Sequence, residues 1–402
     1  MTMLKTTFKM NRVQTGIEAF LCDPPSWLKG QRLGLLCNPA SVDARFRHSR
    51  RLINEKLPGQ LTALFFPQHG FFSEKQDNMI ESEDTLDPDL GVPAFSLYGK
   101  TRRPSRQMYD IIDTLIVDLQ DVGTRVYTFT STVSYCMEAA RLYGKRILIL
   151  DRPNPLGGSR VEGNCLASAC RSFVGRYPIP MRHGLTMAEY ALMINDYFSI
   201  GCDLHIVSMK GWHRSMRFSD TGLPWVSPSP NLPTPFAATV YPGQVIWEGT
   251  NVSEGRGTAL PFELFGAPYI EPGKVLAHMD GCELPGIILR ETAFEPTSNK
   301  WQGSLCRGFQ IHVMDAEAYQ PYETSLMLLQ AVMARHPKSF QWKSPPYEYE
   351  FEKMPIDLII GDTNLRKRLE DMENPSTLFS AWERDLKQFK AMSKPYHLYA
   401  NE

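Results

Sequence analysis

The stretch between Thr114 and Arg125 constrains the fold of this chain more than any other. In its sequence, TLIVDLQDVGTR, an apolar run passes directly into acidic residues, a glycine and an arginine. This design is typical of a strand that is buried on both faces and ends in polar residues. The segments 61–70 and 146–155 are built in the same way. Because ligands of open α/β sheets bind beyond the carboxyl ends of the strands, these three ends predict one shared pocket.

Polar side chains at the three strand ends are the first candidates for ligand contacts. They are Gln68, His69, Asp118, Asp121, Arg125, Asp151, Arg152 and Asn154. Further strands are predicted at 32–41 and 202–209, and helices at 44–56, 131–143 and 186–199. Such alternation of strands and helices is typical of a mainly parallel, doubly wound, Rossmann-like sheet.

The length of 402 residues predicts two domains, since an ordinary domain has about 100–200 residues. We expect a Rossmann-like domain over 1–238 and a smaller auxiliary α/β domain over 239–402. The predicted elements of the second domain are strands at 287–294 and 306–315 and helices at 323–335 and 376–392. Between 212 and 270 proline and glycine recur and no periodicity lasts, which predicts an irregular segment at the domain junction.

Charge and cysteine usage exclude several classes of partner. The formal net charge is −1, so no basic excess would attract nucleic acid or an anionic membrane surface. The eight cysteines lack zinc-ligand spacing and read as reduced core residues. No secretory apolar segment and no run of about 20 apolar residues is present, so we expect a cytoplasmic protein. Nothing in the sequence indicates an oligomeric state.

The usual cofactor motifs are also missing. The turn after the first predicted strand reads CNPAS, without the glycines of a dinucleotide-binding fingerprint. The sequence contains no phosphate-binding loop, no H-E-x-x-H and no nucleophile elbow. We therefore expect no cofactor and no metal.

Two loops combine acids, glycines and an arginine: 118–125 and 248–258. Carboxylates and amides bind hydroxyl groups, and arginine grips a carboxylate, so the loops suit a polyhydroxylated, acid-bearing ligand. Alternatively, the acids pair with the arginines and merely order the loops. Two roles remain open for His69 and His183: they contact the ligand, or they make structural hydrogen bonds. Two roles also remain open for the aromatic side chains of Trp225, Tyr241 and Trp247: they stack on a sugar, or they pack in the core.

A series of long motifs in fixed order resembles the peptidoglycan exo-β-N-acetylmuramidase family of the NamZ type. The motifs are PQHG, SLYGKTRRPS, DLQDVGTRVYTF, LDRPNPLGG, VEG, SFVGRYPIPMRHGLT, GLPWVSPSPNLPT, YPG, EGTNVSEGRGT and PFELFGAP. The resemblance runs from about Val13 to the carboxyl terminus. It implies that the Rossmann-like domain is catalytic and that N-acetylmuramic acid is released from the non-reducing end of peptidoglycan fragments. The expected cytoplasmic location favours recycling or degradation of imported wall fragments.

The motif segments supply the candidate substrate contacts. They are His69, Arg125, Asp151, Arg152, Asn154, His183, Asn231, Glu248, Asn251, Glu254 and Arg256. Arg125 or Arg256 is expected to hold the lactyl carboxylate that distinguishes muramic acid from glucosamine. One carboxyl group would protonate the leaving oxygen, and a second would assist water or stabilise the oxocarbenium-like centre.

The sequence departs from the family at one position. Family members resemble P-E-H-G, with the glutamate taken as the catalytic acid/base, and this chain has Gln68 there. An amide cannot replace a general acid, whose loss costs about 10²–10⁴-fold in rate. Glu74 or Glu81 in the long polar loop could return a carboxylate to this place, or remain solvated loop charges. Asp121 or Glu254 could instead serve alone.

We expect the polar loop to supply the acid, because the other motifs match and the loop is long and acid-bearing. Two other functions remain open. One is a catalytically silent protein that binds muropeptides. The other is a hydrolase for a different acidic glycoside.

Overall fold

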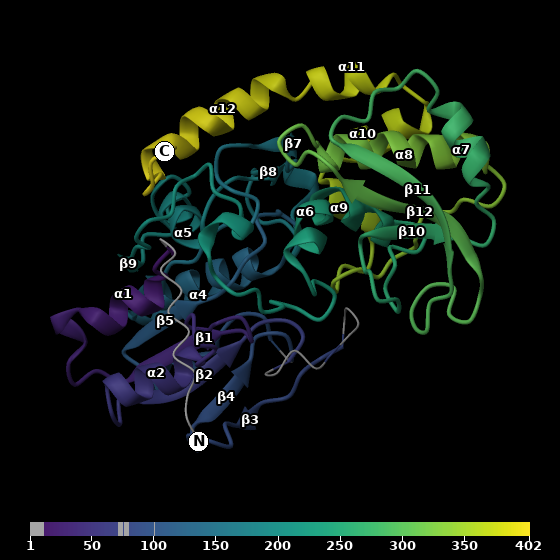
Figure 1. The fold of residues 1–402 in the computed structure, drawn as a ribbon. Helices are drawn as coiled ribbons and strands as arrows, with labels where there is room; N and C mark the ends of the chain where they lie inside the picture. Colours follow the sequence, from purple (N-terminus) through teal and green to yellow (C-terminus); the bar gives the residue numbers. More distant parts are fainter. Residues whose placement is uncertain (1–11, 71–74, 76–79, 100) are drawn as a thin grey trace, which may run out of the picture.

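A mainly parallel sheet of seven strands forms the centre of the first domain (Figure 1). The computed structural model describes residues 12–70, 75, 80–99 and 101–402. In sheet order the strands are β3 (Thr85–Leu86), β4 (Pro93–Ser96), β2 (Leu61–Phe66), β1 (Leu33–Cys37), β5 (Thr114–Asp118), β6 (Arg146–Leu150) and β9 (Asp203–Val207). All neighbours are parallel except β3 and β4. The predicted doubly wound sheet is therefore confirmed.

Helices cover both faces of this sheet, which explains why its strands are apolar without interruption. Leu115 and Val117 of β5 belong to the core under α3 (Arg106–Asp110), α4 (Phe129–Tyr143) and α5 (Met187–Asp196). The intervening Ile116 packs in a separate core with α1 (Gly16–Cys22) and α2 (Ser49–Lys56). Alternate residues of one strand thus serve two cores. Helix α2 begins later than the predicted 44, because Asp43 holds the backbone amides of Arg45 and Arg47 in a turn.

The second domain is built on a three-stranded antiparallel sheet. Its strands, in sheet order, are β10 (Leu264–Ala267), β12 (Cys306–Val313) and β11 (Ile287–Phe294). Its helices are α7 (Pro272–His278), α8 (Pro321–Arg335), α9 (Pro355–Ile360) and α10 (Thr363–Glu370). The predicted strands β11 and β12 are confirmed. The helix predicted over 376–392 is two helices, α11 (Pro375–Ser380) and α12 (Glu383–Ser393), which part where Trp382 is buried against Tyr322.

The junction between the domains is more regular than predicted. Helix α6 (Pro235–Gln244) lies inside the segment expected to be irregular, and the predicted boundary at 238 falls within it. The helix tolerates Pro242 because Thr234 caps its amino end and most of its residues are buried. A short 3₁₀ helix, η4 (Val245–Gly249), and a two-stranded sheet of β7 (Glu162–Cys165) and β8 (Pro180–Arg182) complete this region.

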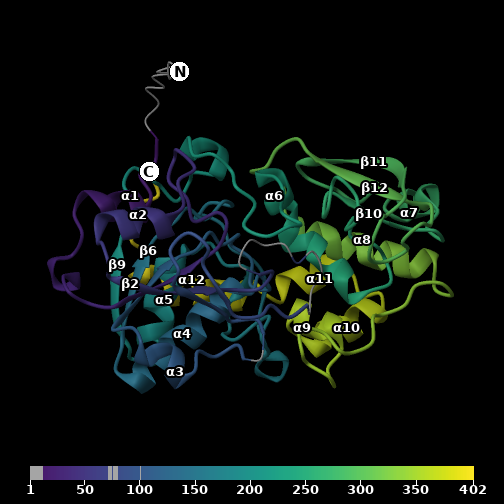
Figure 2. The same cartoon turned by 90° about the horizontal axis from the view of Figure 1, so that it is seen from below.

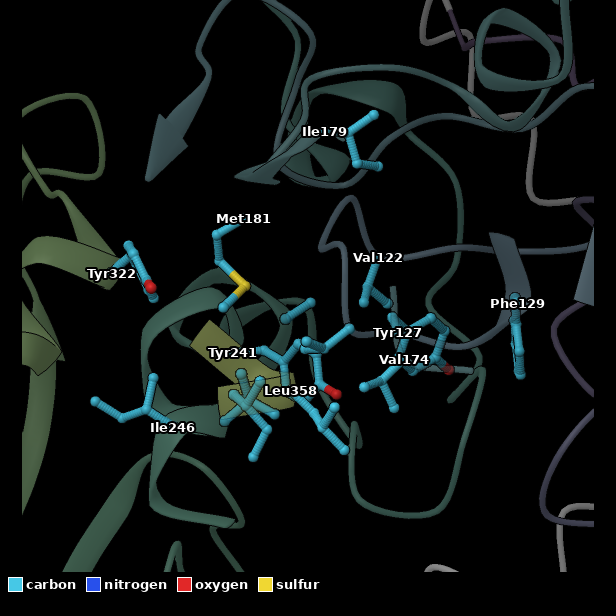
Figure 3. Packing of buried hydrophobic residues seen from close by; sticks show 14 of the residues in the cluster. Val122, Tyr127, Phe129, Val174, Ile179, Met181, Tyr241, Ile246, Tyr322 and Leu358 are labelled. Atoms are coloured by element: carbon cyan, nitrogen blue, oxygen red, sulfur yellow. The ribbon is translucent and has the colours of Figure 1, made fainter. Parts of the chain in front are cut away.

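The two domains lie side by side and share one hydrophobic core (Figures 1 and 2). Figure 3 shows Tyr127 and Met181 of the first domain near Tyr241 and Tyr322 of the second. The ring centroids of Tyr127 and Tyr241 are 5.9 Å apart. A shared core holds the domains in one arrangement, so a site between them is preformed.

The carboxyl-terminal segment also joins the domains. Helix α12 returns from the second domain to the first (Figure 1). The hydroxyl of Tyr399 then donates to Asp151 Oδ2 at 2.6 Å, and the backbone amide of Leu398 donates to Glu189 Oε1 at 2.9 Å. In the part of the chain that the structure describes, no helix has the length and apolarity needed to cross a membrane.

Candidate active site

A pocket opens where the carboxyl ends of β2 and β5 face the second domain. Its lining residues are Gln68, His69, Val126, Tyr127, Thr128, Phe129, Val174, Ser229, Asn231, Leu232, Tyr241, Glu248, Arg256, Phe262, Tyr347 and Glu348. The predicted strand-end pocket exists, but of the strand-end candidates it takes only Gln68 and His69. Seven of the eleven polar side chains in this lining come from residues beyond 228.

Gln68 is held in one orientation by three neighbours. Its Oε1 accepts a hydrogen bond from Thr128 Oγ1 at 2.8 Å. Its Nε2 donates to the hydroxyl of Tyr98 at 3.2 Å and to Glu348 Oε1 at 3.1 Å. The amide is thus a fixed donor to a carboxyl group that comes from the second domain.

Glu348 is the functional candidate that the sequence reasoning missed. Its side chain is buried, and its Oε2 accepts a short hydrogen bond from the hydroxyl of Tyr98. Burial raises the pKa of Glu348 to about 7, although the hydrogen bonds from Tyr98 and Gln68 oppose this shift. A carboxyl group with this pKa can hold a proton near neutral pH and give it up. The local sequence PPYEYE shows acids beside prolines but does not distinguish Glu348 from Glu350.

Glu248 is the second carboxyl group of the pocket, and it has the opposite character. Arg256 Nη2 donates to its Oε1 at 2.7 Å, and the hydroxyl of Tyr347 donates to its Oε2 at 2.8 Å. Burial alone would raise the pKa of Glu248, but the charge and hydrogen bonds of Arg256 hold it below its usual value. The pocket therefore pairs a protonatable acid with an ionised carboxylate, as glycosidic hydrolysis requires.

His69 lines the pocket as a neutral group. Burial lowers the pKa of His69 to about 4, and its Nδ1 lies 2.9 Å from the carbonyl oxygen of Lys75. Its backbone adopts a positive φ of 83° at the end of the strand segment. Asn231 also lines the pocket, as predicted. Neither side chain carries charge at neutral pH, so Arg256 supplies the positive charge of the lining.

The structure corrects the prediction that Arg125 holds a ligand carboxylate. The side chain is fully buried, and its guanidinium donates to the carbonyl oxygens of Asn164, Ile179, Ile359 and Ile360 at 2.7 to 3.2 Å. The last two carbonyls belong to the carboxyl end of α9, where a cation is favoured. Gly361, with φ of +74°, leaves the space for this guanidinium. Arg125 therefore joins the two domains instead of facing the pocket.

Four other strand-end candidates are engaged in structural contacts. Arg152 makes a bidentate ion pair with Asp118: its Nε donates to Oδ1 at 2.6 Å and its Nη2 to Oδ2 at 2.9 Å. Asn154 bonds the backbone of Leu185 and Leu156 and packs against Gly123. Asp151 binds Tyr399 of the carboxyl-terminal segment. None of the four lines the pocket, so the prediction that Asp151, Arg152 and Asn154 contact substrate is corrected.

Asp121 and His183 lie together but outside the pocket lining. Asp121 Oδ2 accepts from the amide of Gly123 at 2.7 Å and lies 3.8 Å from His183 Nε2. Burial raises the pKa of Asp121 to about 7 and lowers that of His183 to about 3. His183 is therefore neutral near neutral pH, whereas Asp121 changes its charge there. The suggestion that Asp121 serves as the acid is not supported by its position.

The remaining predicted residues fall into three groups. Asn251 is tied to Tyr269, Gln341 and Ser339. Glu254 is neutralised by Arg256 at 3.2 Å and Lys300 at 2.8 Å. Glu81 is exposed and lines a different cavity, and Glu74 lies outside the described residues. These placements argue against Glu81 and Glu254 as the acid.

The three aromatic candidates divide between packing and the pocket. Trp225 packs edge-on against Phe218 at 4.7 Å, and the fully buried Trp247 stacks on Phe265 at 4.8 Å. Tyr241 lines the pocket. Within the described residues, no group of three or more histidines, cysteines or acids is arranged to hold a metal ion.

Comparisons with known proteins identify relatives of this chain. Two family models match, "Exo-beta-N-acetylmuramidase NamZ, N-terminal" over 33–236 and its C-terminal counterpart over 239–399. The peptidoglycan β-N-acetylmuramidase NamZ of Bacillus subtilis (strain 168) is 41% identical over 393 residues, covering 98% of this chain and 93% of the relative.

Two crystal structures of DUF1343 family proteins from Bacteroides fragilis NCTC 9343 have the same fold. The first has a TM-score of 0.86 and 33% identity, covering 96% of this chain and 99% of its own. The second has a TM-score of 0.76 and 30% identity, covering 97% and 99%.

Proposed function

This chain belongs to the exo-β-N-acetylmuramidase NamZ family of glycosidases, and we propose that it releases N-acetylmuramic acid from the non-reducing end of peptidoglycan fragments with Glu348 as its acid. One observation carries this proposal. The family's acid position is occupied by Gln68, and the amide of Gln68 is hydrogen-bonded to the carboxyl group of Glu348. The proton donor that position 68 lacks is therefore available within 3.1 Å of it.

In the proposed reaction Glu348 gives its proton to the leaving oxygen, and Gln68 and Tyr98 orient the carboxyl group. Glu248, kept ionised by Arg256, assists the attacking water or stabilises the oxocarbenium-like centre. Both carboxyl groups lie in the pocket wall and are buried. We include in the proposal that the substrates are wall fragments recycled in the cytoplasm, which cell fractionation with an activity assay would test.

The direct test uses the disaccharide N-acetylmuramyl-N-acetylglucosamine. We expect the purified protein to release N-acetylmuramic acid, measured by chromatography, and to keep this activity after exhaustive chelation. Binding of the disaccharide with no release would instead support the silent sugar-binding protein, a function that Gln68 itself favours. Release from another acidic glycoside in place of the disaccharide would support the third function.

Gln68→Glu is expected to bring no increase in turnover at neutral pH. The new carboxylate would lie beside Glu348, and two carboxyl groups in contact share one proton because both cannot ionise. The hydrogen bond that Gln68 donates to Glu348 would be lost as well. Rates of muramic acid release from both proteins, measured between pH 5 and 8, check this expectation. A gain of orders of magnitude would show that the natural protein lacks its acid.

Arg256→Met is expected to weaken binding of N-acetylmuramic acid more than binding of N-acetylglucosamine. Only the former carries the lactyl carboxylate, and a hydrogen bond to a charged group contributes about 1.5–3 kcal/mol. Calorimetric titration with the two sugars measures the difference. Lys343→Met, which removes an exposed cation near Tyr347, is the matched control. An unchanged ratio of the two affinities would mean that the carboxylate is held elsewhere.

A further inference from the structure

The turn that carries Glu348 has an unfavourable backbone. Glu348 and Tyr349 have φ angles of 48° and 64°, in the left-handed region. Tyr347 and Glu350 exchange two backbone hydrogen bonds of 2.9 Å around them, which closes a two-residue hairpin. Such a turn favours asparagine and glycine at its centre, and larger side chains persist there only where their surroundings hold them. Some contact must therefore hold this turn in the pocket wall.

Besides the hydrogen bonds that Gln68 and Tyr98 donate to Glu348, Arg102 from the loop after β4 in the first domain makes such a contact. Its guanidinium carbon lies 3.5 Å from the centre of the Tyr349 ring, and 5.2 and 5.3 Å from the rings of Tyr98 and Phe173. The Tyr98 and Tyr349 rings meet edge to face at 5.7 Å. A guanidinium over the face of a tyrosine ring is attracted to it.

Three aromatic rings surround the guanidinium. Its Nε and Nη2 atoms are buried and have no hydrogen-bond partner among the residues that the structure describes. The ion pairs found in the same residues do not include Arg102. An arginine placed in this way serves the aromatic cluster and not a carboxylate of its own.

We infer that Arg102 is a positioning residue for Glu348: it clamps the strained turn of the second domain onto Tyr98 of the first and sets a positive charge beside the acid. This inference rests on the proposed function, in which Glu348 is the acid. Tyr98 links the two effects, because its hydroxyl bonds Glu348 while its ring contacts both Arg102 and Tyr349.

The charge of Arg102 predicts a shift in the pH profile. The ionisable groups that act on Glu348 are Tyr98 and Arg102 from the first domain, Glu248 from η4, and Tyr347 and Tyr349 from its own turn. Burial raises the pKa of Glu348, and Arg102 opposes that shift. Without the positive charge the pKa rises further, and the acid stays protonated to higher pH. The basic limb of kcat/KM therefore moves to higher pH.

The first experiment compares Arg102→Met, Arg102→Lys and Arg103→Met on the muramyl-glucosamine disaccharide. We expect Arg102→Met to lower kcat by about 100-fold with KM unchanged, because misplacing an acid by about 1 Å costs that much. The basic limb of its kcat/KM profile should move to higher pH. Arg102→Lys keeps the positive charge, so the basic limb of its pH profile should stay in place. Its kcat should fall, but less than that of Arg102→Met. The exposed neighbour Arg103, which pairs with Glu138 at 3.2 Å, is the control and leaves both unchanged.

The variant Tyr349→Gly distinguishes loss of the contact between Arg102 and Tyr349 from a general loss of folding stability. Glycine suits the positive φ, so the variant should unfold no more easily than the natural protein, yet it removes the ring that Arg102 holds. We expect kcat to fall as in Arg102→Met, and the double variant to be no worse than either single one. Natural activity in Tyr349→Gly, losses that multiply in the double variant, or an unmoved basic limb in Arg102→Met would overturn the inference.

A measurement without turnover keeps this inference distinct from the proposed function. The carboxyl carbon of Glu348 can be titrated by NMR, with its signal assigned from Glu348→Gln. A higher pKa in Arg102→Met than in the natural protein is expected even if the protein releases no muramic acid. An equal pKa in both proteins would show that Arg102 does not act on Glu348, whatever the activity.

Discussion

Glu348→Gln is expected to lower the release of N-acetylmuramic acid by about 10²–10⁴-fold, the usual loss when a general acid is removed. Glutamine has the shape of glutamate and can still bond Tyr98 and Gln68, so the fold of the pocket should survive. Burial raises the pKa of Glu348 to about 7. In the natural protein kcat/KM should therefore fall as the pH rises through about 7, because the carboxyl group loses the proton that it must donate.

Two comparisons make this result specific. Glu352→Gln, an exposed acid of the same segment, should leave the rate unchanged. Binding of the disaccharide by Glu348→Gln, measured by calorimetry, should stay within a few fold of natural affinity. A variant that binds and still turns over at the natural rate would remove Glu348 from the reaction. Another residue would then have to donate the proton. Glu74, which lies outside the described residues, would be the next candidate.

Arg125→Met is expected to lower the free energy of unfolding by about 2–4 kcal/mol, since a buried carbonyl left without a partner costs about 1–3 kcal/mol. The carbonyl oxygens of Asn164 and Ile359 lose the bonds that Arg125 provides. The carbonyl of Ile179 keeps one other donor, and that of Ile360 keeps two. Denaturant unfolding, followed by tryptophan fluorescence, measures the change.

The effect of this change on ligand choice should be small. Arg125 lies outside the pocket lining, so the folded variant should prefer muramic acid over glucosamine as the natural protein does. Arg384→Met is the stability control, because that side chain is 84% exposed. A variant of natural stability that has lost the preference for muramic acid would restore Arg125 as a ligand contact.

The sequence by itself determined the first domain's architecture. The apolar runs of β2, β5 and β6 and the helices between them appear in the structure where the pattern predicts them, because burial on two faces is a local property of a strand. Helix α6 was missed because its prolines and glycine disfavour a helix locally, and only its burial between the domains stabilises it. Motif order also identified the family.

The site was predictable only in part. The pattern correctly brought Gln68 and His69 to one pocket, and the motif segments supplied Glu248, Asn231 and Arg256. The sequence pattern could not show which charged side chains pair with each other. Asp118 pairs with Arg152 and Asp151 binds Tyr399, and such pairing depends on what lies opposite after folding.

The proposed acid could be located only in the tertiary structure. Glu348 lies 280 positions from Gln68, on a two-residue turn of the second domain. No periodicity in its segment marks it, and its raised pKa arises from burial against residues of both domains. A carboxyl group becomes an acid through its surroundings, and here those surroundings form only when the shared core joins the two domains.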